Sequence, residues 1–177
     1  MLDVKLKFDN IKILNIEKED IETLYKCIKS NEFIRNIKYD PLINSKELNN
    51  IFYEYYLNEC EFFLKILYKD KIIGVLKGRA EFKNPNEIWV MYFLKYKEYE
   101  NTIIWDKILD KLEIYFFQQY AIDNFYIVID GKNNRFYSVL KNKGFIPTRS
   151  CNILINDRTE DLNIILKKNI KFNRIYR

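Results

Sequence analysis

The order of apolar patterns along the chain predicts an α+β (α/β) domain: a mixed, mostly antiparallel central sheet flanked by about four helices. Three strand-like runs follow one another between residues 61 and 94, and two strand–helix steps come after them. Strands joined by short turns pair antiparallel, whereas a strand–helix step allows the next strand to run parallel to its neighbour. At 177 residues the chain has the length of a single domain spanning residues 1–177.

The first third of the chain predicts one strand and two helices. Residues 11–16 (IKILNI) are rich in β-branched side chains, which favour a strand. Apolar residues at helical spacing then predict a helix from about 21 to 30 and, after a loop around Pro41, a second helix capped by Ser45. The apolar face of the second helix is expected to be Leu48, Ile51, Phe52 and Tyr55.

The remainder alternates between strand and helix patterns. Two runs between residues 61 and 82 predict a hairpin turning at Tyr68–Lys71, and the turn Asn84–Asn86 precedes a third strand over 87–94 (EIWVMYFL). A helix is expected from Asn101, then a strand over 125–129, a short helix over 133–142, a strand from Phe145 and a last strand over 162–168. The buried stripe of the first of these helices is predicted to be Trp105, Ile108, Leu109, Leu112 and Phe116.

Composition excludes several classes of chemistry. The chain has no histidine and no Cys-x-x-Cys, which excludes the usual zinc sites and Ser-His or Cys-His catalysis, and no metal is expected. Three widely spaced cysteines fit reduced thiols better than a disulfide framework. No apolar run reaches the roughly 18 residues of a spanning helix, and the N-terminus lacks a signal-peptide pattern, so a cytoplasmic protein is expected. A net charge of +5 and the basic tail over 169–177 do not by themselves predict a nucleic-acid binder.

The stretch NNRFYSVLKNKGF, residues 133–145, provides the most informative motif. An Asn precedes a short amphipathic helix, and Gly144-Phe145 opens the next strand; with KDKIIGVL in the hairpin and EIWVMYFLKYKEY in the third strand, this order resembles the GNAT superfamily of N-acetyltransferases over residues 11–168. Each motif also has a purely structural explanation. Gly144 can end a helix at positive φ, and Gly74 can permit close packing within a strand.

The resemblance implies acetyl-CoA as cofactor. In this family two neighbouring parallel strands splay apart, here residues 87–94 and 125–129, and the pantetheine arm lies between them while the pyrophosphate rests on the N-terminus of the next helix. The phosphate pattern of Gln or Arg, two residues, Gly, one residue, then Gly or Ala is replaced by Glu100, Ile103 and Trp105. Weak to moderate affinity is therefore expected, with Lys95, Lys97 and Lys107 offsetting the carboxylates of Glu98 and Glu100. The residues implied to bind acetyl-CoA are Phe93, Leu94, Asn101, Thr102, Ile103, Ile104 and Asn133.

Two residues are catalytic candidates by the same resemblance. Glu87 matches a carboxylate that deprotonates the amine, directly or through water; the alternative is a solvent-facing glutamate after a turn. The general acid of the family, a Tyr, aligns with Leu140, and Tyr137 lies three residues earlier on a nearby helical face. Tyr137 either takes over this role or packs against the sheet.

The function implied is acetyl transfer to a primary amine by direct attack within a ternary complex, with a central-strand N–H stabilising the oxyanion. The alternative is a member of the fold that has lost catalysis and serves as a binding or regulatory module. Tyr53 and Tyr56 are expected to line the acceptor pocket, although neither identifies the amine. The expected partner is a small-molecule or peptide amine, without nucleic acid or membrane, and with a possible homodimer.

Overall fold

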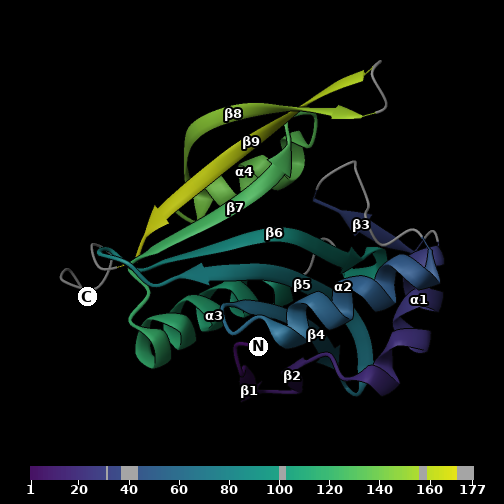
Figure 1. Cartoon of the computed structure of the whole chain (residues 1–177). Coiled ribbons are helices and arrows are strands. Elements are labelled where there is room, and N and C mark those ends of the chain that lie inside the picture. The colour runs from purple at the N-terminus through teal and green to yellow at the C-terminus, as the bar shows by residue number, and fades with distance from the viewer. Residues whose placement is uncertain (31, 37–43, 100–102, 156–158, 171–177) are drawn as a thin grey trace.

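The computed structural model describes residues 1–30, 32–36, 44–99, 103–155 and 159–170 (Figure 1). The α-helices are α1 (Ile21–Lys29), α2 (Ser45–Leu57), α3 (Ile104–Tyr120) and α4 (Asn134–Asn142), with short 3-10 turns η1 (Lys18–Asp20) and η2 (Lys97–Tyr99). The strands are β1 (Lys5–Phe8), β2 (Ile11–Asn15), β3 (Phe33–Arg35), β4 (Glu61–Tyr68), β5 (Lys71–Glu81), β6 (Glu87–Tyr96), β7 (Asn124–Asp130), β8 (Ile146–Ile155) and β9 (Thr159–Asn169).

The nine strands of the described residues belong to one mixed sheet in the order β1-β2-β4-β5-β6-β7-β9-β8, with β3 paired to β6 off this path. The only parallel pair within the described residues is β6 with β7, and it is short: it runs from Glu87↔Asn124 to Val90↔Ile127. Beyond that point the two strands diverge, as Figure 1 shows. The predicted α+β fold with a splayed parallel pair is confirmed.

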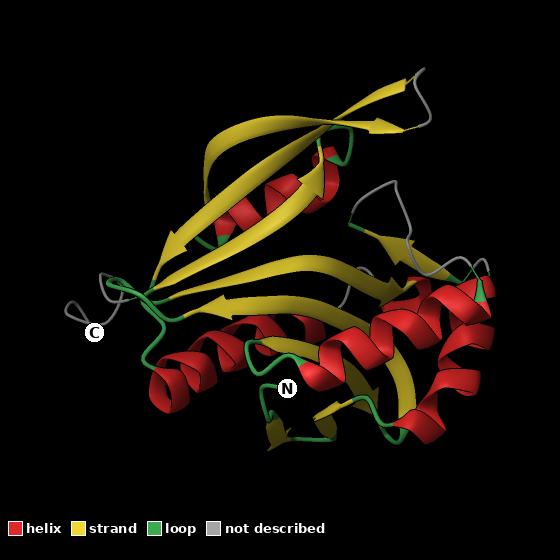
Figure 2. Ribbon diagram, viewed as in Figure 1, coloured by secondary structure: helices red, strands yellow, loops and turns green. Residues whose placement is uncertain are grey.

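The helices cover the two faces of this sheet, and each face has its own apolar core (Figure 2). On one face α3 and α4 bury Trp105, Phe116, Phe136 and Leu140 against the strands. On the other face α1 and α2 bury another cluster, which includes Leu24. Because α3 and α4 lie on the same face, one beside β6 and one after β7, both border the gap between those strands.

The amphipathic helices lie where the sequence predicts them, with differences at their ends. The whole predicted stripe of α3 is buried, from Trp105 to Phe116. The second helix is capped by Asn44 rather than Ser45: the Asn44 side chain accepts a hydrogen bond from the Glu47 N–H at 2.8 Å, and Ser45 is the first helical residue. Since Asn and Ser cap helices equally well, residue preference alone does not separate two adjacent candidates.

Two strands were not predicted. β1 (KLKF) alternates lysine with apolar residues, and all four of its side chains are exposed or half-buried. β3 has only three residues and pairs antiparallel with the end of β6, from Phe33↔Tyr96 to Arg35↔Leu94. Strands this short carry too few residues for a periodic pattern, so their partners decide their conformation.

Candidate functional site

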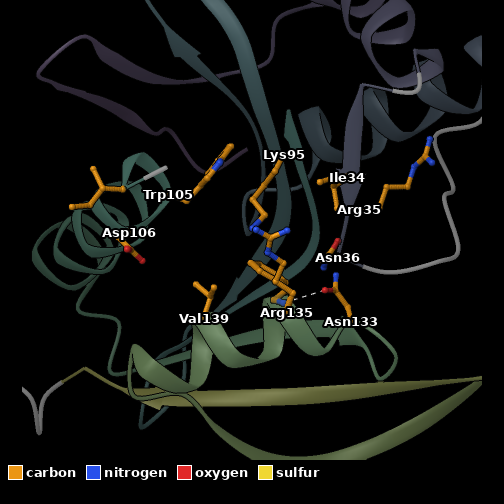
Figure 3. Close-up of a pocket in the computed structure, with 11 residues that line it drawn as sticks. Ile34, Arg35, Asn36, Lys95, Trp105, Asp106, Asn133, Arg135 and Val139 are labelled. Atoms are coloured by element: carbon orange, nitrogen blue, oxygen red, sulfur yellow. Dashed lines mark hydrogen bonds between the residues drawn. The ribbon is translucent and has the colours of Figure 1, made fainter. Parts of the chain in front are cut away.

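A cavity of about 540 Å³ opens beside the diverging part of β6, where α3 begins and α4 passes. Its walls come from β3 and the following Asn36, from β6, from the first turn of α3 and from α4 (Figure 3). The lining residues are Ile34, Arg35, Asn36, Lys95, Ile103, Trp105, Asp106, Asn133, Arg135, Phe136 and Val139. The gap between strands, a helix N-terminus and a cavity therefore coincide in space.

Basic side chains dominate the charge of this cavity. Lys95 is buried, with 7% of its surface exposed, and its ammonium lies 4.0 Å from the ring centroid of Phe136. Such cation–π contact offsets part of the cost of burying the ammonium. Figure 3 shows Arg135 reaching from α4 toward Lys95, whereas Arg35 points away and donates to the Ile28 carbonyl at 3.3 Å. Lys95 and Arg135 thus make the cavity suitable for an anionic ligand.

The first turn of α3 supplies backbone donors to the same cavity. Its N-cap residue, Ile103, makes no side-chain capping hydrogen bond and is 70% exposed. The first N–H groups of a helix lack intrahelical partners and, together with the helix dipole, favour an anion. Asp106 lies in this turn, but its carboxylate is 3.6 Å from the Lys143 ammonium, which compensates its charge.

The carboxylates predicted to oppose a phosphate were Glu98 and Glu100. Glu98 turns to Lys71, with 3.5 Å between the carboxylate and the ammonium, and does not line the cavity. Glu100, Asn101 and Thr102 lie outside the described residues. Of the lysines expected to offset this charge, Lys95 lines the cavity and Lys107 forms an ion pair with Asp9 at 2.9 Å.

The motif over residues 133–145 forms α4 together with both of its ends. Asn133 caps the helix by accepting a hydrogen bond from the Phe136 N–H at 3.1 Å, and it also lines the cavity. Gly144, at φ 85°, ends the helix: its N–H donates to Lys141 O and the Phe145 N–H donates to Leu140 O, each at 3.0 Å. These two bonds form a Schellman motif, which explains the glycine structurally.

Gly74 likewise has a packing role. A Cβ at this position would lie 2.5 Å from the Trp105 ring and 2.9 Å from the Leu94 carbonyl oxygen. Trp105 borders the cavity, so the glycine allows this wall to pack directly on the sheet.

Glu87 lies at the start of β6, where the parallel pair begins, and is 8% exposed. One carboxylate oxygen accepts from the Tyr126 hydroxyl at 3.2 Å and from the Asn124 amide at 3.4 Å. The other pairs with the Lys83 ammonium at 2.9 Å. Hydrogen bonds to Glu81 and Glu87 raise the pKa of Lys83, so this lysine remains charged. Glu87 is thus a nearly buried carboxylate, fixed by hydrogen bonds and an ion pair, rather than a freely solvated side chain.

An aromatic pair next to Glu87 was not predicted. Trp89 on β6 stacks on Tyr126 of β7 with centroids 4.1 Å apart and an interplanar angle of 4°. Arg149 lies over the Trp89 ring at 5.7 Å, and Lys167 lies over the Tyr126 ring at 5.4 Å. These residues are distant in sequence and meet only through the strand order β6-β7-β9-β8, so no local pattern reveals them.

The other predicted site residues are spread over the molecule. Phe93 and Leu94 lie buried on β6, and Ile104 starts α3. Tyr53 and Tyr56 are exposed on α2, and Tyr137 is partly buried and packs against the core of the α3–α4 face. Leu140, which occupies the family's tyrosine position, is fully buried. Of the described residues implied to be catalytic or to bind acetyl-CoA or the amine, only Ile103 and Asn133 line the cavity; Lys95, expected to offset charge there, lines it too.

Comparison with known proteins identifies the family. The model of the acetyltransferase (GNAT) domain matches residues 13–163, most of the chain. The chain belongs to the GNAT acetyltransferase family. No curated protein matches its sequence.

Solved structures of other GNAT acetyltransferases share this fold at low identity. RimL, a ribosomal L7/L12 α-N-protein acetyltransferase in complex with coenzyme A, superposes with a TM-score of 0.76 at 13% identity, covering 94% of this chain and 98% of that one. The microcin C7 self-immunity acetyltransferase MccE, in complex with acetyl-CoA and AMP, gives 0.73 at 19% identity, with 92% and 93% covered. A chimera of the spermidine N-acetyltransferase SpeG from Vibrio cholerae and hSSAT gives 0.75 at 12% identity, with 93% and 98% covered.

Proposed function

We propose that this GNAT protein is an acetyl-CoA-dependent N-acetyltransferase that transfers the acetyl group to a primary amine by direct attack. The observation that carries the proposal is the coincidence of the β6–β7 gap, the N-terminus of α3, whose N-cap residue Ile103 makes no side-chain capping hydrogen bond, and a cavity lined by Lys95 and Arg135. An acyl-CoA is a long molecule with a polyanionic phosphate end and an amide-bearing arm. The end of the cavity at α3 suits the polyanionic phosphate end, and the gap between β6 and β7 suits the amide-bearing arm.

The residues fit such a donor best at its phosphate end. The N–H groups at the start of α3 and the two basic side chains would hold the phosphates. The pattern glycines are absent, and the exposed Ile103 side chain stands at the first turn instead. The fit therefore supports binding of weak to moderate affinity.

The chemistry required of the protein is modest. Bound acetyl-CoA supplies an activated thioester, and the attacking amine must lose a proton as the new C–N bond forms and the C–S bond breaks. Glu87 is the proposed proton acceptor, directly or through water. Its carboxylate is fixed by hydrogen bonds at the start of the paired strands β6 and β7, and the chain has no histidine. Tyr137 is the proposed proton donor to the departing thiolate; Leu140 supplies no hydroxyl at the usual position.

The acceptor is proposed to be a small-molecule or peptide amine. The superposed relatives include a protein N-terminal acetyltransferase and a spermidine acetyltransferase, so both amine classes enter the test. Besides Tyr53 and Tyr56 on α2, the Trp89–Tyr126 stack beside Glu87 offers an aromatic surface for this substrate.

A thiol-release assay tests the proposal. Purified protein is incubated with acetyl-CoA and a panel of amines, which includes peptides with free N-termini and polyamines. The masses of the products are measured by mass spectrometry. Amine-dependent thiol release together with an acetylated product is expected. Binding of acetyl-CoA without transfer to any amine would instead support the catalytically degenerate binding module. Absence of binding at millimolar acetyl-CoA would contradict the proposed enzyme.

A further inference from the structure

The edge of β6 that faces the gap is already occupied by another segment of this chain. The pairing of β6 with β7 ends at Val90. Beyond it, the next partner of this edge of β6 is the segment Glu32–Asn36, which we call the β3 strap. Its middle, β3, pairs with Leu94–Tyr96, and at its start the Glu32 carbonyl accepts from the Lys97 N–H at 2.7 Å. Figure 1 shows β3 beside the end of β6, in the opening between β6 and β7.

Asn36 closes the strap at the point where the two strands separate. Its side-chain amide donates to Val128 O on β7 at 2.6 Å and to Met91 O on β6 at 3.3 Å. Its side-chain oxygen accepts from the Phe93 N–H at 2.7 Å. Only 2% of its surface is exposed. One side chain thus connects both strands across the gap.

The main chain of Asn36 makes the same connection. Its N–H donates to Phe93 O at 3.0 Å, and its carbonyl accepts from the Asp130 N–H on β7 at 2.6 Å. Because the Asn36 side chain takes the Phe93 N–H, the Asn36 carbonyl is available to β7. The gap-facing groups of β6 are therefore paired from the Met91 carbonyl to the Lys97 N–H.

We propose that the β3 strap is an autoinhibitory segment, which must leave the β6 edge before an acyl-CoA donor can lay its amide-bearing arm there. This inference rests on the proposed function. Amides entering a gap between strands need unpaired N–H and C=O groups, since unmade hydrogen bonds of buried amides are costly. The strap is hydrogen-bonded to the N–H and C=O groups at this edge of β6. The arm and the strap therefore compete for the same strand edge.

The competition has a measurable consequence for affinity. If only a small fraction of molecules has the strap released, the apparent dissociation constant is the intrinsic one divided by that fraction. Locking the strap should remove binding of the arm, and weakening it should strengthen binding. The phosphate end of the donor meets the first turn of α3 and is not subject to this competition.

A disulfide across the strap provides the test. Phe33 and Tyr96 are directly paired across β3 and β6, with ring centroids 5.3 Å apart, and Phe33 belongs to the core of the α1–α2 face. Paired residues on adjacent antiparallel strands have the Cα separation that a disulfide needs. The variant Phe33→Cys/Tyr96→Cys is made with Cys27, Cys60 and Cys151 changed to Ser. The same protein, oxidised or reduced, then has the strap locked or free.

Two probes separate the strap from the phosphate site. Desulfo-coenzyme A carries the full arm without a thiol that would reduce the disulfide, and adenosine 3′,5′-bisphosphate carries no arm. Calorimetry should show desulfo-coenzyme A binding at least about tenfold more weakly to the oxidised than to the reduced protein. Adenosine 3′,5′-bisphosphate should bind both forms equally. In the native cysteine background, Asn36→Ala should bind desulfo-coenzyme A more tightly than the wild type does, because it frees the Phe93 N–H.

The contrary outcomes are distinct. Equal affinity of both redox forms for desulfo-coenzyme A overturns the strap but leaves the proposed function standing. If oxidation weakens the binding of both probes equally, the strap proposal is also overturned, because the effect is then not specific to the arm. Weaker binding by Asn36→Ala means that Asn36 supports the site rather than obstructing it. If wild type, reduced variant and Asn36→Ala all fail to bind either probe, the proposed function fails and the strap proposal fails with it.

Discussion

At the scale of single residues, Glu87 bears the proposed proton transfer. Glu87→Gln keeps the size of the side chain and its contacts with Tyr126 and Asn124 but removes its basicity. Turnover should fall by about 10²-fold or more, with acetyl-CoA affinity little changed and the loss shrinking at high pH, where the amine arrives deprotonated. Steady-state kinetics across pH measure this.

Matched variants locate the effect. Glu81→Gln is the control, because Glu81 also pairs with Lys83 but is not proposed to touch the substrate. Tyr137→Phe is expected to have a smaller effect than Glu87→Gln. Full activity of Glu87→Gln across pH, combined with loss in Tyr137→Phe, would assign the chemistry to the helix tyrosine.

A buried ion pair outside the site gives a second prediction at this scale. Glu113 on α3 and Lys168 on β9 lie 2.7 Å apart, each with 8% of its side chain exposed. Glu113→Leu should lower the free energy of unfolding by about 3 kcal/mol, because Lys168 is left buried without this partner. Adding Lys168→Met should restore most of the loss, as chemical denaturation would show. A double variant no better than the single one would contradict this account.

The pH dependence of this pair follows from its burial. Burial raises the pKa of Glu113 above its ordinary value of 4.5, and Lys168 only partly opposes the shift. The Oε1 atom of Glu113 is buried without a hydrogen-bond partner in the described chain. The folded state therefore keeps the proton to higher pH than the unfolded state. Wild type should lose stability relative to Glu113→Gln as the pH rises from 4.5 through the raised pKa. The opposite slope would mean that the pairing with Lys168 outweighs burial.

At the scale of elements, the two glycines of the predicted motifs have separable roles. Gly144 lies at positive φ, and a Cβ there would make only an ordinary contact, 3.8 Å from the Lys168 Cε. Gly144→Ala should therefore cost about 1 kcal/mol of stability through backbone strain and leave acetyl-CoA affinity unchanged. Gly74→Ala places a Cβ against Trp105, a wall of the cavity, and should reduce both stability and affinity. Thermal melts with calorimetry distinguish them. Loss of affinity in Gly144→Ala would give this glycine a functional role.

The elements that the sequence predicts are those with long periodic patterns. α3 buries every third or fourth residue, and β4 to β6 are separated by polar turns, so each is recognisable locally. β3 is not, because three residues become a strand only through the free edge of β6. The cap of α2 was misplaced by one residue because Asn44 and Ser45 are equally good capping residues.

At the scale of the whole molecule, the order of elements predicted a mixed sheet with helices packed on it, without β1 and β3, and the resemblance to the GNAT family implied the splayed parallel pair. The cavity beside this splay was not predicted as such; only residues that would bind acetyl-CoA were named. Ile103 and Asn133, which the resemblance implied to bind acetyl-CoA, line it. Asn36 comes from a segment whose local sequence carries no signal of a site, and Arg135 was not singled out although it lies within the 133–145 motif. They become neighbours only when β3, β6 and α4 converge. Side chains that meet through sheet topology are the part that a single sequence does not reveal.

The central claim is that this cavity binds acetyl-CoA. Calorimetric titration of acetyl-CoA into wild type, Val139→Trp and Ser138→Trp tests it directly. Val139 lines the cavity on α4, and Ser138 is its exposed neighbour, so the two variants add similar bulk inside and outside the cavity. Saturable binding below about 1 mM is expected for wild type and Ser138→Trp, with at least about tenfold weaker binding by Val139→Trp. Undiminished binding by Val139→Trp, or no binding by wild type, would contradict the claim.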